Sequence, residues 1–194
     1  MKRILPLLLA ALLCLAPLCA MAASPAIAFT DDDGREVHLS APATRIISLY
    51  SAHTENLYFL GAGGALIGAH STSTFPPEAA ALPRYDYQGD PESVIAANPD
   101  LVLIRPFISK KSPDFVAALE KAGIPVVSLY PEKLEQFDDY IRKLALLTGT
   151  GENAEALLKD FHARLDAVES RTAAFTPKAR VFFESTETEL RTVT

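Results

Sequence analysis

Residues 45–79, RIISLYSAHTENLYFLGAGGALIGAHSTSTFPPEA, and residues 89–104, GDPESVIAANPDLVLI, decide the fold of this 194-residue chain. The apolar run at 45–49 is typical of a buried strand, and residues 52–60 have the pattern of an amphipathic helix. A second strand, expected at 66–69, follows a glycine-rich turn at 61–64. The sequence therefore predicts a strand, a helix and a second strand in immediate succession.

The same order is repeated further along the chain. A strand expected at 101–104 leads to a helix at about 113–122, and a strand expected at 125–129 leads to a helix at about 134–147. Strands that alternate with helices form a parallel sheet covered on both faces. We therefore expect an α/β fold with a Rossmann-like parallel sheet flanked by helices.

Local signals mark the ends of these elements. Asp90-Pro91 and Ser112-Pro113 each place a capping side chain before a proline at the first helical position. Gly123 and Gly149 stand just beyond the expected helix ends. Before the first strand of the sheet, residues 27–39 alternate around an Asp-Gly turn, which predicts a hairpin.

Residues 1–22 have the composition of a secretory signal peptide. Lys2 and Arg3 precede an apolar run at 4–18, and Ala20-Met21-Ala22 is an A-x-A cleavage site. A membrane anchor is the alternative, but the run is shorter than the roughly 20 residues that span a bilayer. We expect cleavage near Ala22 and a periplasmic mature protein.

Cleavage would remove both cysteines, Cys14 and Cys19, so the mature chain could form no disulfide. It would also change the formal net charge from −6 to −8, because Lys2 and Arg3 are lost. An acidic surface repels nucleic acid and anionic membranes. We expect a monomer that does not bind nucleic acid.

Three motifs carry a family resemblance. They are S-x-x-TE-x-L-x-x-LGAG at 51–63 with IG at 67–68, PPEA at 76–79, and ESVIAANPDLVL at 92–103. In these motifs, and from about residue 26 to its end, the chain resembles the first lobe of periplasmic solute-binding proteins of the cobalamin and ferric-siderophore class. The resemblance implies a protein that captures an iron complex (siderophore or haem) or cobalamin and delivers it to an ABC permease.

An amphipathic helix is expected at 152–173, with one apolar stripe, and strand-like residues follow it at 179–183. The resemblance implies a lobe at 23–149, a connecting backbone helix at 150–175 and the start of a truncated second lobe at 176–194. The alternative is a single domain in which residues 179–183 add an edge strand. We expect truncation, and with it weak ligand binding.

Ligands of open α/β sheets bind beyond the carboxyl ends of the strands. The loops at that edge supply the candidate ligand contacts Tyr50, Ser51, His53, Tyr87, Arg105 and Phe107. The resemblance itself places contacts at Tyr87 and Arg105. Tyr87 could instead cover the sheet edge, and Arg105 could be a solvated charge.

His53 has a second possible role as a metal ligand. His70, with Glu55 or Asp86, would complete the set of three or four ligands that a metal needs. No spacing typical of a metal site accompanies them, and a loop histidine more often forms hydrogen bonds. We therefore predict neither a metal site nor a cofactor.

Glu92 stands in the first turn of the helix that Asp90 caps. Interaction with the helix dipole would account for it, at about 0.3–1 kcal/mol. The resemblance implies a sharper role, in which a glutamate here pairs with an arginine of the membrane permease.

Enzyme motifs are missing from the sequence. It has no G-x-S-x-G elbow, and Thr148-Gly149-Thr150-Gly151 lacks the lysine of a phosphate-binding loop. We predict a binding protein rather than an enzyme. The alternatives are a chelatase-like enzyme acting on a metal or tetrapyrrole through His53 and Glu55, a metal-ion-binding protein, and a truncated remnant that binds no ligand.

Overall fold

The computed structural model describes residues 27–177, 179 and 180. A hairpin of β1 (Ile27–Thr30) and β2 (Glu36–Leu39) comes first, with Ile27 paired to Leu39. The expected hairpin is confirmed. The expected signal peptide and residues 181–183 of the expected strand lie outside the described residues, and Ala179 and Arg180 are not in a strand.

The main sheet has five parallel strands in the order β5-β4-β3-β6-β7. The strands are β3 (Ile46–Ser48), β4 (Leu66–His70), β5 (Arg84–Tyr85), β6 (Leu101–Ile104) and β7 (Val126–Ser128). The chain enters at the central strand β3, continues outward through β4 and β5, and then returns to the other side of β3 for β6. The direction of winding therefore reverses between β3 and β6.

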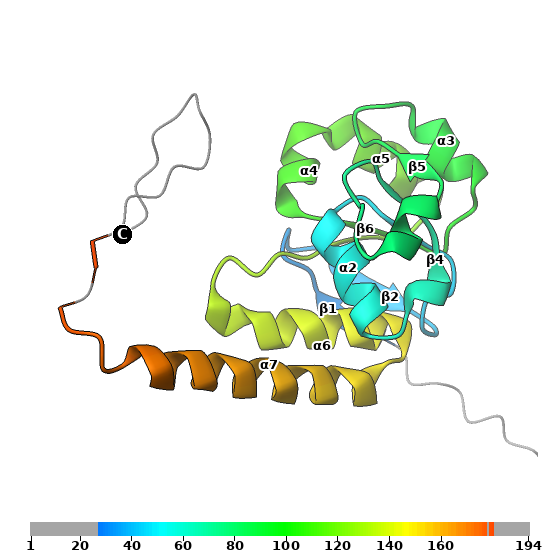
Figure 1. Cartoon of the computed structure of the whole chain (residues 1–194). Helices are drawn as coiled ribbons and strands as arrows, with labels where there is room; N and C mark the ends of the chain where they lie inside the picture. Colours follow the sequence, from blue (N-terminus) through cyan, green and yellow to red (C-terminus); the bar gives the residue numbers. More distant parts are fainter. Residues whose placement is uncertain (1–26, 178, 181–194) are drawn as a thin grey trace, which may run out of the picture.

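Helices connect these strands (Figure 1). They are α2 (Ser51–Phe59), α3 (Pro91–Ala96), α4 (Pro106–Lys111), α5 (Pro113–Lys121), α6 (Phe137–Thr148) and α7 (Gly151–Thr172). Short 3-10 turns occur at η1 (Gly63–Ala65), η2 (Pro77–Ala81) and η3 (Leu134–Gln136). The expected parallel α/β fold is thus confirmed.

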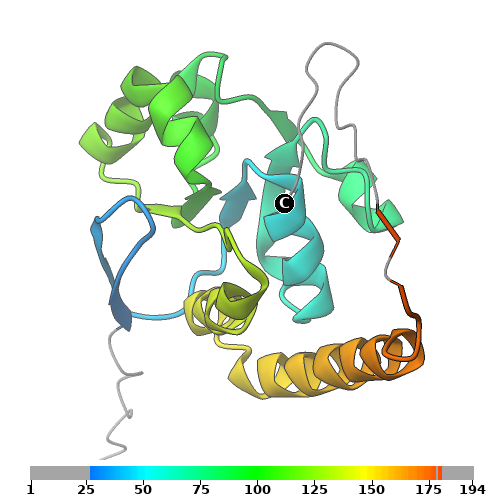
Figure 2. The same cartoon turned by 90° about the vertical axis from the view of Figure 1, so that its left-hand side faces the viewer.

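The sheet separates two hydrophobic cores, because successive side chains of a strand point to opposite faces. Ile46 of β3 packs on one face with α2, α6, α7 and the hairpin. Ile47 packs on the other face with α3, α4 and α5. In Figure 2, α4 and α5 accordingly lie on the far side of the fold from α6 and α7.

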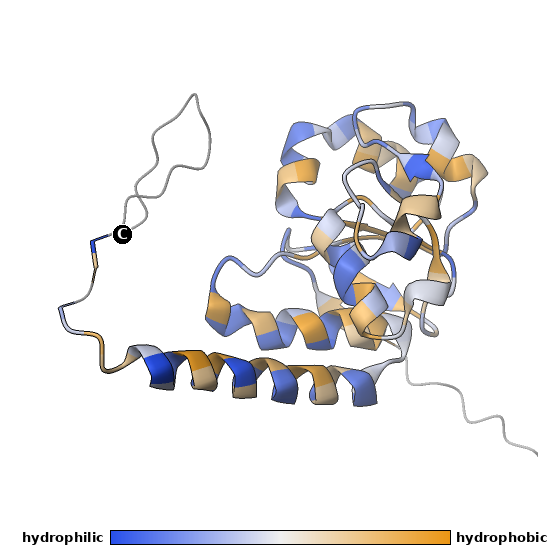
Figure 3. Cartoon of the chain, in the orientation of Figure 1, coloured by the Kyte–Doolittle hydropathy of each residue, from blue (hydrophilic) through white to orange (hydrophobic). Residues whose placement is uncertain are grey.

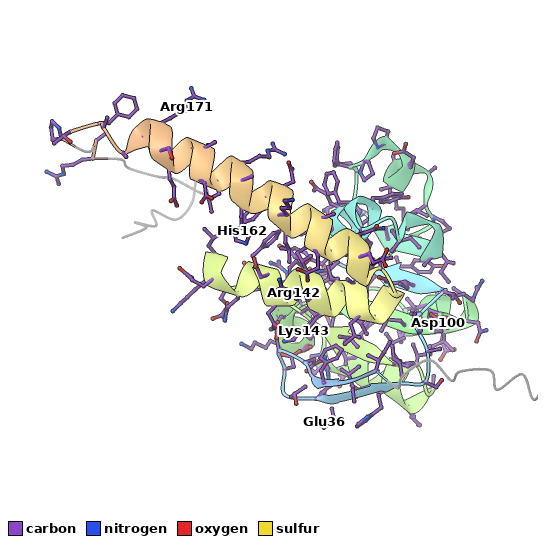
Figure 4. All side chains as sticks on the ribbon, turned by 90° about the horizontal axis from the view of Figure 1, so that it is seen from below. Glu36, Asp100, Arg142, Lys143, His162 and Arg171 are labelled. Atoms are coloured by element: carbon purple, nitrogen blue, oxygen red, sulfur yellow. The ribbon has the colours of Figure 1, made fainter. Side chains whose placement is uncertain are left out.

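The last two helices lie side by side, and α7 continues past the end of α6 (Figure 1). Apolar and polar residues alternate along both helices (Figure 3). Leu158, near the start of α7, is 2% exposed, whereas Val168 near its end is 55% exposed. Figure 4 shows Arg142 of α6 beneath α7, where its Nε donates to Glu155 at 2.7 Å. The expected apolar stripe therefore packs in its first half only.

The hairpin turn is tied to the sheet through a buried carboxylate. Asp31 accepts hydrogen bonds from the backbone N–H of Asp33, Arg35 and Ser128 and from Nε of Arg35. Asp32 in turn accepts from the N–H of Tyr130 at 2.6 Å. The turn is thus held against the end of β7.

Several local expectations need correction. Pro106 and Phe107, expected in a loop after the strand, begin α4, and the two-residue strand β5 was not expected. Asp90 caps α3 through the N–H of Glu92, as predicted, but the Ser112 side chain makes no capping bond. Ser112 has φ −135° and ψ 61° because it joins α4 directly to α5. Gly149 ends α6 at φ 72°, as expected.

Within the described part of the chain, no helix combines the length and the apolar character needed to cross a bilayer.

Candidate ligand-binding site

The reversal between β3 and β6 positions the candidate site. Tyr50 is the second residue after β3, and Arg105 is the first residue after β6. The two strands are neighbours, with Ser48 paired to Leu103. The carboxyl ends of strands at such a reversal form the crevice where open α/β sheets bind their ligands. The topology therefore places Tyr50 and Arg105 at one edge of the sheet, as the sequence predicted.

Arg105 is the centre of this edge. Its guanidinium carbon lies 4.6 Å from the ring centroid of Tyr50, 4.9 Å from that of Phe107 and 6.0 Å from that of Tyr130. Among residues 27–177, 179 and 180, no carboxylate lies within ion-pair distance of it. The cation is thus held by aromatic faces and keeps its hydrogen-bond donors for an external group.

The aromatic rings continue on both sides of Arg105. Tyr130 lies 6.2 Å from Tyr50, Tyr87 lies 6.5 Å from Phe107, and His70 stacks on Tyr87 at 5.4 Å, all between ring centroids. Phe107 is 48% exposed and Tyr130 37% exposed, so these faces are open to a ligand. We call this surface the aromatic platform: Tyr50, His70, Tyr87, Arg105, Phe107 and Tyr130.

Hydroxyl groups border the platform at the end of β4. Ser51 Oγ and Thr72 Oγ1 are 2.7 Å apart, and Thr72 Oγ1 lies 2.8 Å from Nδ1 of His70. His70 Nε2 is 4.0 Å from Asp86. Ser51 is half-buried beside exposed Thr72, which leaves polar atoms at the rim of the aromatic surface.

A cavity of about 660 Å³ adjoins the platform at Pro106 and Tyr130. It lies between the hairpin turn, the start of α4 and the segment from β7 to α6. Its charged lining residues are Asp32, Asp33, Lys110, Glu132, Glu135, Asp139 and Lys143. A volume of this size is in the range of small-molecule sites.

The structure corrects the expectation that His53 contacts a ligand. Its exposed fraction is 0%, and its ring is bonded through Nδ1 to the Tyr140 hydroxyl at 2.8 Å and through Nε2 to the Ile104 carbonyl at 3.0 Å. Burial lowers the pKa of His53 from 6.5 to about 4, and the backbone bond to Ile104 only partly offsets this. A neutral, buried and fully bonded imidazole is not available at the surface.

The same geometry bears on the residue that the metal and chelatase alternatives share. In the portion of the chain covered by the structure, no three His, Cys, Asp or Glu side chains are grouped closely enough to hold a metal ion. His53, on which both alternatives depended, has no free nitrogen.

Tyr130 was missed by the sequence reasoning. It is the second residue after β7, as Tyr50 is the second residue after β3. The rule that ligands bind beyond the carboxyl ends of strands would have found Tyr130, had it been applied to the fourth expected strand.

The remaining candidates differ in their surroundings. Tyr87 is half-buried, so it both covers the end of β5 and offers a ring face to the platform. Glu92 is exposed in the first turn of α3, and among the described residues its carboxylate has no hydrogen-bond or ion-pair partner.

Open α/β sheets bind their ligands at such a reversal, and this sheet carries aromatic rings and a cation there. A family model described as periplasmic binding protein matches residues 46–190. The vitamin B12-binding protein of Vibrio parahaemolyticus is 30% identical over 154 residues, which cover 78% of this chain and 55% of that protein.

Two solved structures have a similar fold. The periplasmic haem-binding protein of Pseudomonas aeruginosa has a TM-score of 0.63 at 28% identity, covering 68% of this chain and 48% of that one. The periplasmic vitamin B12-binding protein of Vibrio cholerae has a TM-score of 0.58 at 28% identity, covering 69% and 52%.

The chain belongs to the periplasmic binding protein family, a class of binding proteins. It spans about half the length of the curated relatives that it matches.

Proposed function

We propose that this chain belongs to the solute-binding component of an ABC importer and that its ligand rests on the aromatic platform. The observation that carries the proposal is Arg105, an unpaired cation held among the rings of Tyr50, Phe107 and Tyr130 at the reversal of the sheet. Its position and its lack of a partner among the described residues both suit capture of an anionic group.

The platform indicates the kind of ligand. The neighbouring rings, which are tilted against one another by 56° (Tyr50 and Tyr130) and 87° (Tyr87 and Phe107), present several apolar surfaces. Such a lining suits a large, partly apolar ligand better than a bare ion or a small sugar. The guanidinium suits a carboxylate, phosphate or catecholate oxygen on that ligand. Haem, cobalamin and ferric siderophores all combine such features, and we propose this group of ligands.

Two further parts of the proposal concern location and docking. The basic and apolar composition of residues 1–22 supports export and cleavage near Ala22, which would give a periplasmic monomer. The exposed carboxylate of Glu92, without a partner among the described residues, supports a contact with a basic residue of the permease. Residues 23–149 would then form the ligand-binding lobe, and α7 the connecting helix.

Ligand retention tests the main proposal. Purified protein is dialysed to equilibrium against haemin, cyanocobalamin or a ferric tris-catecholate, and the ligand retained with the protein is measured by absorbance. We expect at least one probe to be retained, and Arg105→Ala to weaken that binding about tenfold, because a charge-assisted contact is worth roughly 1.5–3 kcal/mol. Arg164→Ala, on exposed α7, is the control.

Retention of none of the three probes would contradict the proposed ligands. Equal retention by wild type and Arg105→Ala would contradict the role of the platform.

Uptake by cells that carry the cognate permease tests Glu92. In the complete two-lobed protein, Glu92→Ala should lower uptake while ligand affinity is nearly unchanged, whereas Glu152→Ala, in the first turn of α7, should change neither. Normal uptake by Glu92→Ala would leave the helix dipole as the only role of Glu92.

A further inference from the structure

His53 lies directly beneath the aromatic platform, in the first turn of α2. The Ile104 carbonyl can only accept, so Nε2 of His53 carries the proton and Nδ1 accepts the hydrogen bond from the Tyr140 hydroxyl. Asn56 Nδ2 donates to the same hydroxyl at 3.1 Å. These three bonds fix the tautomer and the orientation of the ring.

From this position the imidazole reaches the segments that carry three platform residues. Its ring meets that of Tyr50 edge-on, at 5.0 Å between centroids and an interplanar angle of 88°. It bonds to Ile104, the residue before Arg105, and it also interacts with the backbone of Leu129, the residue before Tyr130. One buried side chain thus connects the ends of β3, β6 and β7.

Satisfaction of the backbone does not explain this arrangement. The Ile104 carbonyl already accepts a hydrogen bond from the N–H of Leu129 at 3.0 Å. An apolar side chain at position 53 would therefore leave this carbonyl with a partner. The hydrogen bond from His53 instead constrains the orientation of the backbone at the end of β6, immediately before Arg105.

We propose that His53 is a positioning residue for the aromatic platform, oriented by Tyr140 and Asn56, and that it sets the geometry in which Arg105 lies over Tyr50. The role of the platform in ligand capture rests on the proposed function. The effect of His53 on the position of Arg105 does not.

The position of Arg105 can be measured without a ligand. Protons above an aromatic face are shifted upfield, so the side-chain NMR signals of Arg105 report its place over Tyr50 and Phe107. Arg105→Lys assigns those signals by their loss. His53→Leu, which deletes both ring hydrogen bonds, should move the Arg105 signals toward the values of a solvated arginine.

Two further variants separate positioning from folding. His53→Gln keeps an amide donor for the Ile104 carbonyl and should retain at least half of the upfield shift. Leu158→Ala opens the core between α6 and α7, far from the platform, and should leave the shift unchanged. If His53→Leu does not fold, Tyr140→Phe replaces it, because loss of the hydroxyl releases the ring and should reduce the shift.

Ligand binding supplies the second measurement. With haemin, cyanocobalamin or the ferric tris-catecholate, whichever the wild type retains, His53→Leu should bind about tenfold more weakly than Leu158→Ala, as expected for loss of a residue that orients contact groups. Unchanged Arg105 signals in folded His53→Leu, or in Tyr140→Phe where that variant replaces it, would overturn the positioning role. If the wild type retains none of the three probes, the ligand proposal fails while the NMR comparison still decides the role of His53.

Discussion

The buried imidazole of His53 should make the stability of this protein depend on pH in a defined window. Its pKa is lowered from 6.5 to about 4, chiefly by burial. The unfolded chain therefore binds a proton at this site at a higher pH than the folded chain does. The stabilisation from His53 is complete above pH 6.5 and is lost progressively as the pH falls toward about 4.

The size of the effect follows from the two pKa values. A difference of one pKa unit corresponds to about 1.4 kcal/mol, so the full effect is about 3 kcal/mol. Between pH 7 and pH 5 the free energy of unfolding should fall by about 2 kcal/mol on account of this residue alone. Solvent screening does not reduce this free energy, because the side chain of His53 is 0% exposed.

Urea unfolding of wild type and His53→Gln at pH 7, 6 and 5 isolates this contribution. Far-UV circular dichroism is the suitable signal, since the chain has no tryptophan. Carboxylates and the other histidines titrate in both proteins, so the difference between the two pH profiles belongs to His53. We expect His53→Gln to be less stable at pH 7 but to lose about 2 kcal/mol less by pH 5. Parallel profiles would show that His53 titrates normally and would refute this account of its burial.

Two other substitutions test the fold. Gly68→Ala in β4 should cost about 1–3 kcal/mol of unfolding free energy, because the added Cβ would overlap the ring of Tyr85. Gly64→Ala should be nearly neutral, because no atom lies within 4 Å of its added Cβ. Equal urea midpoints for the two variants would contradict this. Asp31→Ala should cost about 3 kcal/mol, because it leaves four donors of the hairpin and β7 without their acceptor, and an unchanged urea midpoint would show that the turn is not held by this carboxylate.

The strands and long helices could be predicted because their periodic patterns extend over enough residues. Residues 46–48 and 101–104 are apolar throughout, as expected of strands buried on both faces. The misses are short elements. The two residues of β5 are too few to show a periodic pattern. The helix α4 begins at Pro106, and a proline is equally typical of a loop and of a first helical position.

The candidate site could be predicted as far as topology determines it. The rule for carboxyl ends of strands placed Tyr50, Tyr87, Arg105 and Phe107 at one edge, and the structure brings their rings and the guanidinium together. The rule selects segments, however, and not the direction of each side chain within them. That direction depends on how the following helix packs on the sheet.

The helical position of His53 explains why its side chain lies in the core and not at the surface of this edge. Leu57 and Leu60, four and seven positions later, are both fully buried, so His53 belongs to the apolar stripe of α2. This spacing was present in the sequence and argued against a ligand contact. A histidine can occupy such a stripe only if both nitrogens are bonded, and its partner Tyr140 is 87 residues away. The burial of His53 was thus predictable from its helix, whereas its connection to the ends of β6 and β7 required the tertiary structure. The proposed positioning role of His53 therefore links the aromatic platform to α6, through the buried hydroxyl of Tyr140.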